Sequence, residues 1–312
     1  MHPALSIIFF TAASGTGYGL LALLAAGALA GHLAADPGFG ICAFGLGLGL
    51  VGAGLLSSLG HLGHPERTWR ALTQWRSSWL SREGVAATMT FVPALLFAGY
   101  WVLGGSISAS AAVLTIVGAV VTTICTAMIY ASLRPVHAWR NPWTVPIYLV
   151  LAFYAGALWL ALLVFAFDLQ LPGVSLLVAM LGLAGSALKR GYWAFLDRGR
   201  ADSTPETATG LGAIGKVRML DPPHTESNYL LKEMGFRVAR KHSARLRLLV
   251  LVAGFGVPIL LSLLANVSGT GPATFMSLVA AVLGSIGVVA ERWLFFAEAR
   301  HTVTLYYGAS HA

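Results

Sequence analysis

The sequence predicts an all-helical integral membrane protein, built as a bundle of eight transmembrane helices. Of its 312 residues, 57% are hydrophobic and only 10% are charged, whereas a soluble domain carries about a quarter charged residues. The apolar residues lie in long uninterrupted runs and not in amphipathic stripes, as expected of segments that cross a bilayer. The positions of the charged residues support the same class and orient the bundle.

Eight apolar windows are long enough to span, since a helix needs roughly 20 residues to cross a hydrocarbon core about 30 Å thick. In chain order they are residues 5–30, 38–60, 84–103, 109–131, 144–166, 172–195, 248–267 and 274–298. The first has no positively charged residues before it, so we expect a membrane helix and not a cleaved signal peptide. Short Gly- or Pro-containing turns such as ADPGFG and QLPGV join neighbouring spans into hairpins. We therefore treat 1–312 as a single eight-helix membrane domain.

All 20 Lys and Arg residues fall on one side of this arrangement. The connections after spans one, three, five and seven contain none of them, and the basic residues follow or end the even-numbered spans. Under the positive-inside rule, we expect that side and both termini to be cytoplasmic. A miscounted span would have scattered the basic residues, so their distribution also supports the count of eight.

The segment 196–247 is the only sizeable piece predicted to lie outside the membrane. GRADSTPETATGLG is typical of a loop, and NYLLKEMGFRVARKHSARLRLL predicts a helix with apolar and basic faces. Two interpretations remain open for this helix. It can lie on the membrane surface beside anionic lipid, or it can form part of a docking surface for a soluble partner.

Several kinds of site are not expected in this chain. Cys42 and Cys125 lie alone within spans, so we expect no iron–sulfur cluster. None of the nine histidines lies near a span centre, which argues against haem, and no HExxH or similar pattern indicates a metal site. The glycines of GFGICAFGLGLGLVGAGLL indicate close helix packing. We also expect no nucleic-acid partner and no catalytic residue for substrate chemistry.

The connection SSLGHLGHPERTWRALTQWRSSWLSREG, residues 57–84, concentrates charged and aromatic residues between two apolar runs. His61 and His64 end span two and Glu83 begins span three, so an imidazole and a carboxylate converge at one membrane boundary. Such a pair suits proton transfer to a lipid-soluble quinone. Structural explanations stay open, because a helix dipole favours Glu83 at a helix start and a histidine can cap a helix end. Arginines and tryptophans at this depth are also ordinary membrane anchors.

Three motifs in the chain resemble one known family. His61-Leu62-Gly63, followed by Pro65 and Arg67, resembles the HLGxPxR signature of the membrane anchor subunits of dimethyl-sulfoxide-reductase-type molybdoenzymes. The run SWLSRE, residues 78–83, resembles that family's SxLSxE segment. The run ERWLFF, residues 291–296, is more loosely similar to its closing acid and GRxxFY-like element, because the glycine is absent and the acid directly precedes the arginine.

The resemblance implies an anchor in the bacterial cytoplasmic (inner) membrane that holds a ferredoxin-like iron–sulfur subunit and a molybdopterin catalytic subunit. Such an anchor exchanges electrons with ubiquinone or menaquinone. The family's quinone-site histidine falls on His61 and its acid on Glu83. Further quinone-site candidates are His64, Arg67, Trp79, Tyr130 and Arg292. Candidates for docking the partner are Arg70, Arg76, Arg82, Arg134 and Arg140.

A narrower resemblance concerns HPALSIIFFTAASGTGYGLL and DPPHTESNYLLKEMGFRVARKH, which are similar to segments in the anchors of cytoplasmic sulfite-oxidising molybdoenzymes. It implies oxidation of sulfite to sulfate on the cytoplasmic side, with electrons passing to quinone. Two alternatives stay open. The complex can run the other way, as a reductase of an S-oxide, N-oxide or polysulfide, or the chain can be a membrane transporter. Against a transporter stand the lack of mid-span ionisable residues and of an inverted repeat with broken helices.

Overall fold

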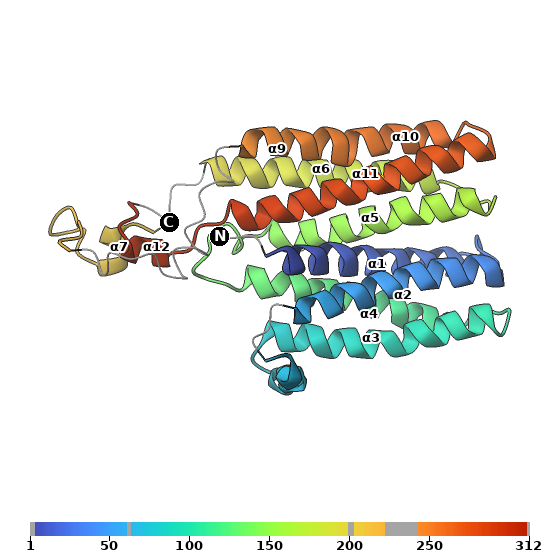
Figure 1. Ribbon diagram of the computed structural model, residues 1–312, viewed down its shortest axis with the longest axis horizontal. Coiled ribbons are helices and arrows are strands. Elements are labelled where there is room, and N and C mark those ends of the chain that lie inside the picture. The colour runs from blue at the N-terminus through green and yellow to red at the C-terminus, as the bar shows by residue number, and fades with distance from the viewer. Residues whose placement is uncertain (1–3, 61–63, 199–202, 222–241, 311–312) are drawn as a thin grey trace.

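The computed structural model describes residues 4–60, 64–198, 203–221 and 242–310. These residues form helices and connecting turns, with no strand among them. Eight helices within the described ranges are long and apolar enough to cross a membrane, and Figure 1 shows them running side by side as one bundle. The predicted all-helical, eight-span class is therefore confirmed.

Seven spans are single helices, and the remaining one combines three helical segments. The single helices are α1 (Leu5–Leu29), α2 (Pro37–Leu59), α3 (Trp79–Val102), α4 (Ala109–Ala131), α5 (Thr144–Ala166), α6 (Val174–Arg198) and α11 (Thr270–Ala297). The seventh span joins α9 (Ser243–Leu249), the π-helical η3 (Val250–Gly256) and α10 (Val257–Ala265). Three short elements lie outside the spans: the 3₁₀ helix η1 (Pro65–Gln74), α7 (Pro205–Thr209) and α12 (Val303–Tyr306).

Some helix boundaries differ from the predicted ones. The third span begins at Trp79 and not at residue 84, because the hydroxyl of Ser78 caps the helix by accepting a hydrogen bond from the Ser81 amide. Glu83 consequently lies within the helix and not at its first residue. The seventh span begins at Ser243, ahead of the predicted 248, which places Arg245 and Arg247 on the helix.

Helix α1 lies inside the bundle and packs against α2, α4, α5 and α11. Glycines let it approach two neighbours closely. A Cβ on Gly17 would lie 2.5 Å from the Gly47 carbonyl oxygen of α2, and one on Gly19 would overlap the Ala152 carbonyl oxygen of α5. Small residues at such crossings are the usual means of tight helix packing in membranes.

One end of the bundle carries the described basic residues. The start of α1, the end of α11, η1, α7 and α12 all lie at this end (Figure 1). Every Lys and Arg that the structure describes lies on η1, on the part of α3, α6, α9 or α11 nearest this end, or in the connections that adjoin η1, α7 and α12 or join α4 to α5. We call this the basic end of the bundle. Because α3 starts and α4 finishes here, residues early in α3 meet residues late in α4.

Candidate functional site

Glu83 is a buried carboxyl near the basic end of α3. Its side chain is only 4% exposed. The hydroxyl of Thr126, late in α4, donates a hydrogen bond to Glu83 Oε1. The Thr126 hydroxyl also lies 3.1 Å from the carbonyl oxygen of Thr122, one turn earlier. Helices α3 and α4 therefore place a carboxyl and a hydroxyl together inside the bundle, away from bulk water.

The predicted histidine pair is only partly described. His61 lies outside the described residues. His64 is exposed, and its Nδ1 lies 3.0 Å from Glu66 Oε1. Arg67 is also exposed, with its Nε 3.7 Å from the same carboxylate oxygen. The structure thus brings His64 and Arg67 together around Glu66 on η1, and no ion pair among the described residues joins them to Glu83.

Arg82 ties η1 to the start of α3. Its guanidinium lies over the ring of Trp79, 4.2 Å from the ring centroid. Its Nε donates to the Trp75 carbonyl at 2.9 Å and its Nη2 to the Arg76 carbonyl at 2.7 Å. Arg82 and Trp79 therefore hold the residues that follow η1 against the first turn of α3, which is a structural role.

The other predicted docking arginines form an exposed surface at the basic end. Arg70 and Arg76 stack beside Trp69 and Trp75, whose rings are 62% and 52% exposed. Exposed tryptophans beside arginines are typical of membrane interfaces and of protein interfaces alike. The exposed arginines are Arg70, Arg76, Arg134 and Arg140.

Tyr130 and Arg292, predicted from separate spans, meet through an aromatic cluster. Tyr130 packs against four rings: Trp139, Tyr148, Phe295 and Phe296. The Arg292 guanidinium lies over the ring of Tyr148, 4.0 Å from its centroid. The cluster joins α4, α5 and α11 and buries Tyr130 and Arg292 on the bundle interior.

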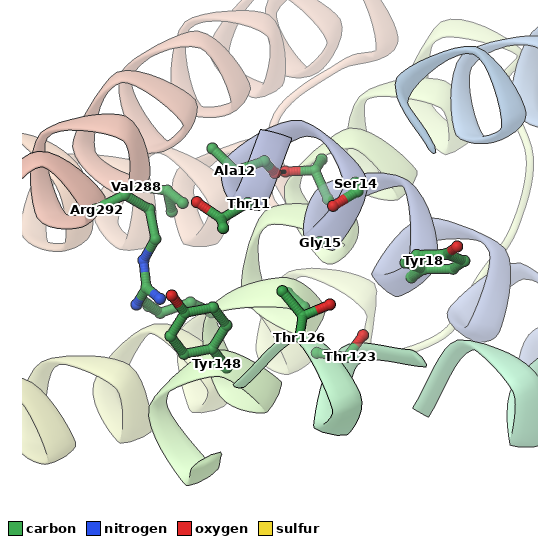
Figure 2. A pocket seen from close by; sticks show the side chains of 13 residues that line it. Thr11, Ala12, Ser14, Gly15, Tyr18, Thr123, Thr126, Tyr148, Val288 and Arg292 are labelled. Carbon is green, nitrogen blue, oxygen red and sulfur yellow. Dashed lines mark hydrogen bonds between the residues drawn. The ribbon is translucent and has the colours of Figure 1, made fainter. Parts of the chain in front are cut away.

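Arg292 also lines a cavity between α1, α4, α5 and α11 (Figure 2). Figure 2 shows Arg292 and Tyr148 on one side of it, Thr123 and Thr126 on another, and Thr11 and Ser14 from α1 above. Its lining includes the hydroxyls of Ser14, Tyr18 and Thr16. Thr126, the hydrogen-bond donor to Glu83, and Arg292 therefore share one polar cavity.

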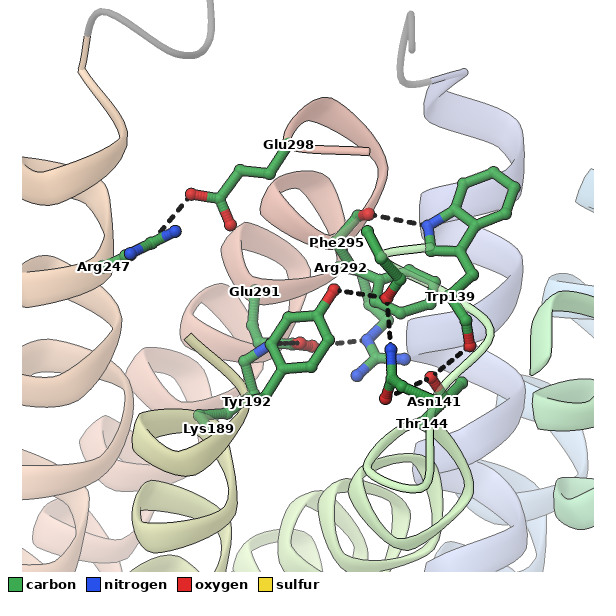
Figure 3. Close-up of polar contacts among 11 residues, drawn as sticks. Trp139, Asn141, Thr144, Lys189, Tyr192, Arg247, Glu291, Arg292, Phe295 and Glu298 are labelled. Atoms are coloured by element: carbon green, nitrogen blue, oxygen red, sulfur yellow. Dashed lines mark hydrogen bonds and ion pairs between the residues drawn. The ribbon is translucent and has the colours of Figure 1, made fainter. Parts of the chain in front are cut away.

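Sequence reasoning missed a buried ionic triad next to this cavity (Figure 3). Lys189 Nζ lies 2.7 Å from Glu291 Oε1, and Arg292 Nε lies 2.5 Å from Glu291 Oε2. The side chains are 0%, 0% and 2% exposed in the order Lys189, Glu291, Arg292. Lys189 Nζ also lies over the Tyr192 ring, 4.1 Å from its centroid. Lys189 and Arg292 thus each pair with a different oxygen of the Glu291 carboxylate inside the bundle.

A second ionic group continues from the triad to the surface. Arg247 lies 2.8 Å from a carboxylate oxygen of Glu298 and 2.8 Å from one of Asp197, and the Asp197 side chain is 62% exposed. Glu298 follows the last residue of α11; burial raises the pKa of its carboxyl, and the Arg247 guanidinium opposes that shift. Because Glu298 also interacts with Lys189, the charges alternate in sign from Asp197 to Arg292.

The signal that could have found the triad is Lys189 itself. It lies beside Arg190 in the second half of the apolar window 172–195, and an ionisable residue inside a span is by default a candidate functional residue with a buried partner. The partner could not be named, because Glu291 lies in another span and only the fold brings the two together. Among the residues that the structure describes, no group of three His, Cys, Asp or Glu side chains could hold a metal ion.

Comparisons with known proteins agree with the fold and the motifs. The family model of the DMSO reductase anchor subunit (DmsC) matches residues 1–297. A sulfite dehydrogenase subunit of Allochromatium vinosum is 32% identical over 330 aligned positions, which cover 98% of this chain and 99% of that protein. The resemblance of the motifs therefore extends over the whole chain. The chain belongs to the DMSO reductase anchor subunit family, as a multi-pass membrane anchor of a DMSO reductase-type complex.

Proposed function

We propose that this anchor passes electrons from the iron–sulfur cluster of a partner subunit to quinone, during oxidation of sulfite to sulfate in a molybdopterin subunit. The quinone site is formed at the basic end by His61 and Glu83. The substrate follows the similarity to the sulfite dehydrogenase subunit of Allochromatium vinosum. The partners are a ferredoxin-like iron–sulfur subunit and a molybdopterin subunit, both on the cytoplasmic side.

The observation that carries the proposal is the buried carboxyl of Glu83 in a chain of this family. Glu83 is buried, yet it lies only a few residues from the exposed η1 connection. His61 lies two positions beyond Leu59, the last residue of α2, in the connection that leads to η1. A buried carboxyl at a membrane boundary, with a histidine in the adjoining connection of the sequence, has the chemistry that proton exchange with a lipid-soluble ring requires.

The residues of this chain supply positioning and proton transfer. Oxidation of sulfite with one water releases two electrons and two protons, and quinone takes up two of each to become quinol. His61 hydrogen-bonds one ring oxygen of the quinone, and Glu83 passes a proton toward it. A threonine hydroxyl can donate to a carboxylate or accept from a carboxylic acid, so Thr126 can stay bonded to Glu83 in both of its protonation states. His64, Arg67, Trp79, Tyr130 and Arg292 are supporting residues in this proposal.

The exposed basic surface fits the partner. Arg70 and Arg76, with their adjoining tryptophans, face outward on η1. Together with Arg82, Arg134, Arg140 and the segment 196–247 they would meet an iron–sulfur subunit with an acidic face. The positive-inside rule places this end, with both termini, in the cytoplasm.

The test is purification through a tag on this chain in a mild detergent, followed by assay of sulfite-dependent quinone reduction. We expect co-purified subunits that contain molybdenum and iron, and loss of turnover in His61→Ala. The matched control is His32→Ala, since His32 is an exposed histidine in the connection between α1 and α2, at the other end of the bundle. Unchanged turnover in His61→Ala would contradict the assignment of His61 to the quinone site.

The same preparation tests the substrate. Complexes that co-purify but reduce an S-oxide, N-oxide or polysulfide with electrons from quinol, and do not oxidise sulfite, would overturn the sulfite assignment and retain the quinone site. Complexes that contain the partner subunits but react with no quinone in either direction would overturn the quinone assignment itself.

A further inference from the structure

The cavity between α1, α4, α5 and α11 has the size and the lining of a water site. The volume open to water is about 20 Å³, and about 10–15 Å³ by this measure is enough for one water molecule. Apolar cavities of such size stay dry, whereas polar ones hold water that makes two to four hydrogen bonds. Five threonine and serine hydroxyls and two tyrosines line this cavity, so its walls offer several hydrogen-bonding groups.

The cavity walls also carry buried donors that need acceptors. Arg292 is 2% exposed, and its Nη1 and Nη2 have no hydrogen-bond partner among the residues that the structure describes. The hydroxyls of Tyr18 and Tyr148 also have no hydrogen-bond partner of normal geometry among these residues, although Tyr148 interacts with the Arg292 guanidinium and Tyr18 with Thr122. A guanidinium keeps its charge in proteins, and leaving its N–H groups unbonded in a buried site is costly. Water bound in the cavity would supply acceptors for these donors.

On the opposite wall the hydroxyl groups can receive hydrogen bonds. Thr11, Ser14, Thr16 and Thr123 each donate to a carbonyl of their own helix, and their oxygens retain lone pairs that can accept. Thr126 donates to Glu83 and can accept in the same way. A water in this cavity therefore accepts from the Arg292 side and donates toward the threonine side.

We propose that this cavity holds ordered water that connects Arg292 by hydrogen bonds to Thr126, and through Thr126 to Glu83. The guanidinium orients the water so that its hydrogens point toward Thr126. Arg292 is then a positioning residue that acts on Glu83 from inside the bundle and does not touch the quinone. The positioning role of Arg292 rests on the proposed role of Glu83 in quinone reduction. The water site does not depend on that proposal.

The first test is X-ray radiolytic hydroxyl-radical footprinting of the purified complex, which labels buried side chains that lie beside bound water. We expect Tyr18 and Tyr148 to be modified. Tyr154 and Tyr192 are the matched controls, because they are buried tyrosines that do not line the cavity and whose hydroxyls donate to the carbonyls of Gly254 and Ala138. Labelling of Tyr18 and Tyr148 no faster than that of Tyr154 and Tyr192 would overturn the water site.

The second test separates a positioning role from quinone contact. In Arg292→Gln, Glu291 keeps its ion pair with Lys189, so the fold retains a partner for the carboxylate. We expect turnover to fall by about tenfold, the effect of losing one positioning hydrogen bond, with the KM for quinone unchanged, and Arg292→Lys to recover part of the loss. A raised KM with unchanged turnover would show quinone contact and overturn the positioning role.

Arg247→Gln is the matched control for the second test, since it removes an arginine from the outer ionic group without touching the cavity. Assembly with the partner subunits is measured for each variant, and equal losses of turnover in Arg247→Gln and Arg292→Gln would contradict the proposal. The two proposals fail separately. Footprinting reads the water without turnover, whereas full turnover in His61→Ala would remove only the quinone site.

Discussion

Glu83 and Glu291 are both buried carboxyls near the basic end, but their surroundings differ in charge. Glu291 lies between Lys189 and Arg292, at 2.7 and 2.5 Å. Glu83 receives its hydrogen bond from the neutral hydroxyl of Thr126. A buried carboxylate between two cations stays ionised, because protonation would leave a buried positive charge without its counter-ion.

The difference assigns the two residues to different tasks. The triad around Glu291 connects α6 to α11 and fixes a charge inside the bundle, which suits a structural role. A carboxyl bonded to a hydroxyl can gain or lose a proton while the hydroxyl switches between donor and acceptor. Of these two carboxyls, only Glu83 has the freedom that proton exchange requires.

The largest effect we expect is on stability, in Glu291→Gln. The substitution leaves Lys189 and Arg292 buried without a carboxylate between them, and breaking a buried pair in this way costs about 3–5 kcal/mol. The measurement is the free energy of unfolding in mixed detergent micelles. Lys189→Met is the comparison, because Glu291 then keeps Arg292 and the remaining pair is neutral. If the free energy of unfolding falls equally in the two variants, neutralisation of the buried cations by Glu291 is not what stabilises the fold.

Glu83→Gln should behave in the opposite way. The amide has the shape of the carboxyl and can still accept from Thr126, so we expect the free energy of unfolding to change by less than about 1 kcal/mol. Because an amide cannot transfer the proton, quinone reduction should fall by about 100-fold. Steady-state assays beside unfolding curves test both statements. A variant that turns over normally, or that unfolds as readily as Glu291→Gln, would remove the contrast between the two carboxyls.

The sequence predicted the fold well because membrane spans follow from two simple physical signals. The apolar windows have the length that a bilayer demands, and all Lys and Arg fall on one side of the spans. The start of α3 was predicted five residues late, at 84 and not at Trp79, because Arg82 and Glu83 were taken to end the apolar window. The cap at Ser78, the contacts of Arg82 with backbone carbonyls and the hydrogen bond that Glu83 accepts from Thr126 offset the cost of placing these residues on the helix.

The site was less predictable, because it depends on contacts between spans. The sequence singled out Glu83, Tyr130 and Arg292 as separate candidates, and the structure places Tyr130 and Arg292 in one aromatic cluster. The sequence alone gave no reason to pair Lys189 with Glu291, or Thr126 with Glu83. The argument against mid-span ionisable residues also overlooked Lys189, which is fully buried. Such pairs follow from which helix faces meet, and hydropathy carries no information about that.

A smaller effect is expected from Thr126→Val, which sharpens the role of the donor to Glu83. Valine keeps the shape of the side chain and removes the hydroxyl, so Glu83 loses its hydrogen bond and its connection to the cavity. We expect turnover to fall by about tenfold, the effect of losing one hydrogen bond, with a loss of stability of about 1–2 kcal/mol. Thr115→Val is the control, because that buried hydroxyl of α4 donates to the Ala111 carbonyl at 2.8 Å and lies away from the cavity. Equal effects on turnover in the two variants would show that Thr126 matters only for packing.

The smallest effect concerns a carboxylate outside the membrane spans, Glu206 of α7, which accepts a hydrogen bond from the Val217 amide at 3.0 Å. Its backbone amide, the Thr204 hydroxyl and the Val217 amide lower the pKa of its carboxyl below the ordinary value of 4.5. A lowered folded-state pKa contributes stability above 4.5 that is lost as the pH falls through the folded-state pKa. Hydrogen exchange at the Val217 amide, corrected for intrinsic rates, should therefore lose protection below about pH 4.5. In Glu206→Gln, protection of the Val217 amide should be the same above and below about pH 4.5. A loss of protection at low pH that persists in this variant would assign the effect to another group. Because Glu206 lies on α7, outside the membrane spans, Glu206→Gln should leave quinone reduction at neutral pH unchanged, in contrast to Glu83→Gln.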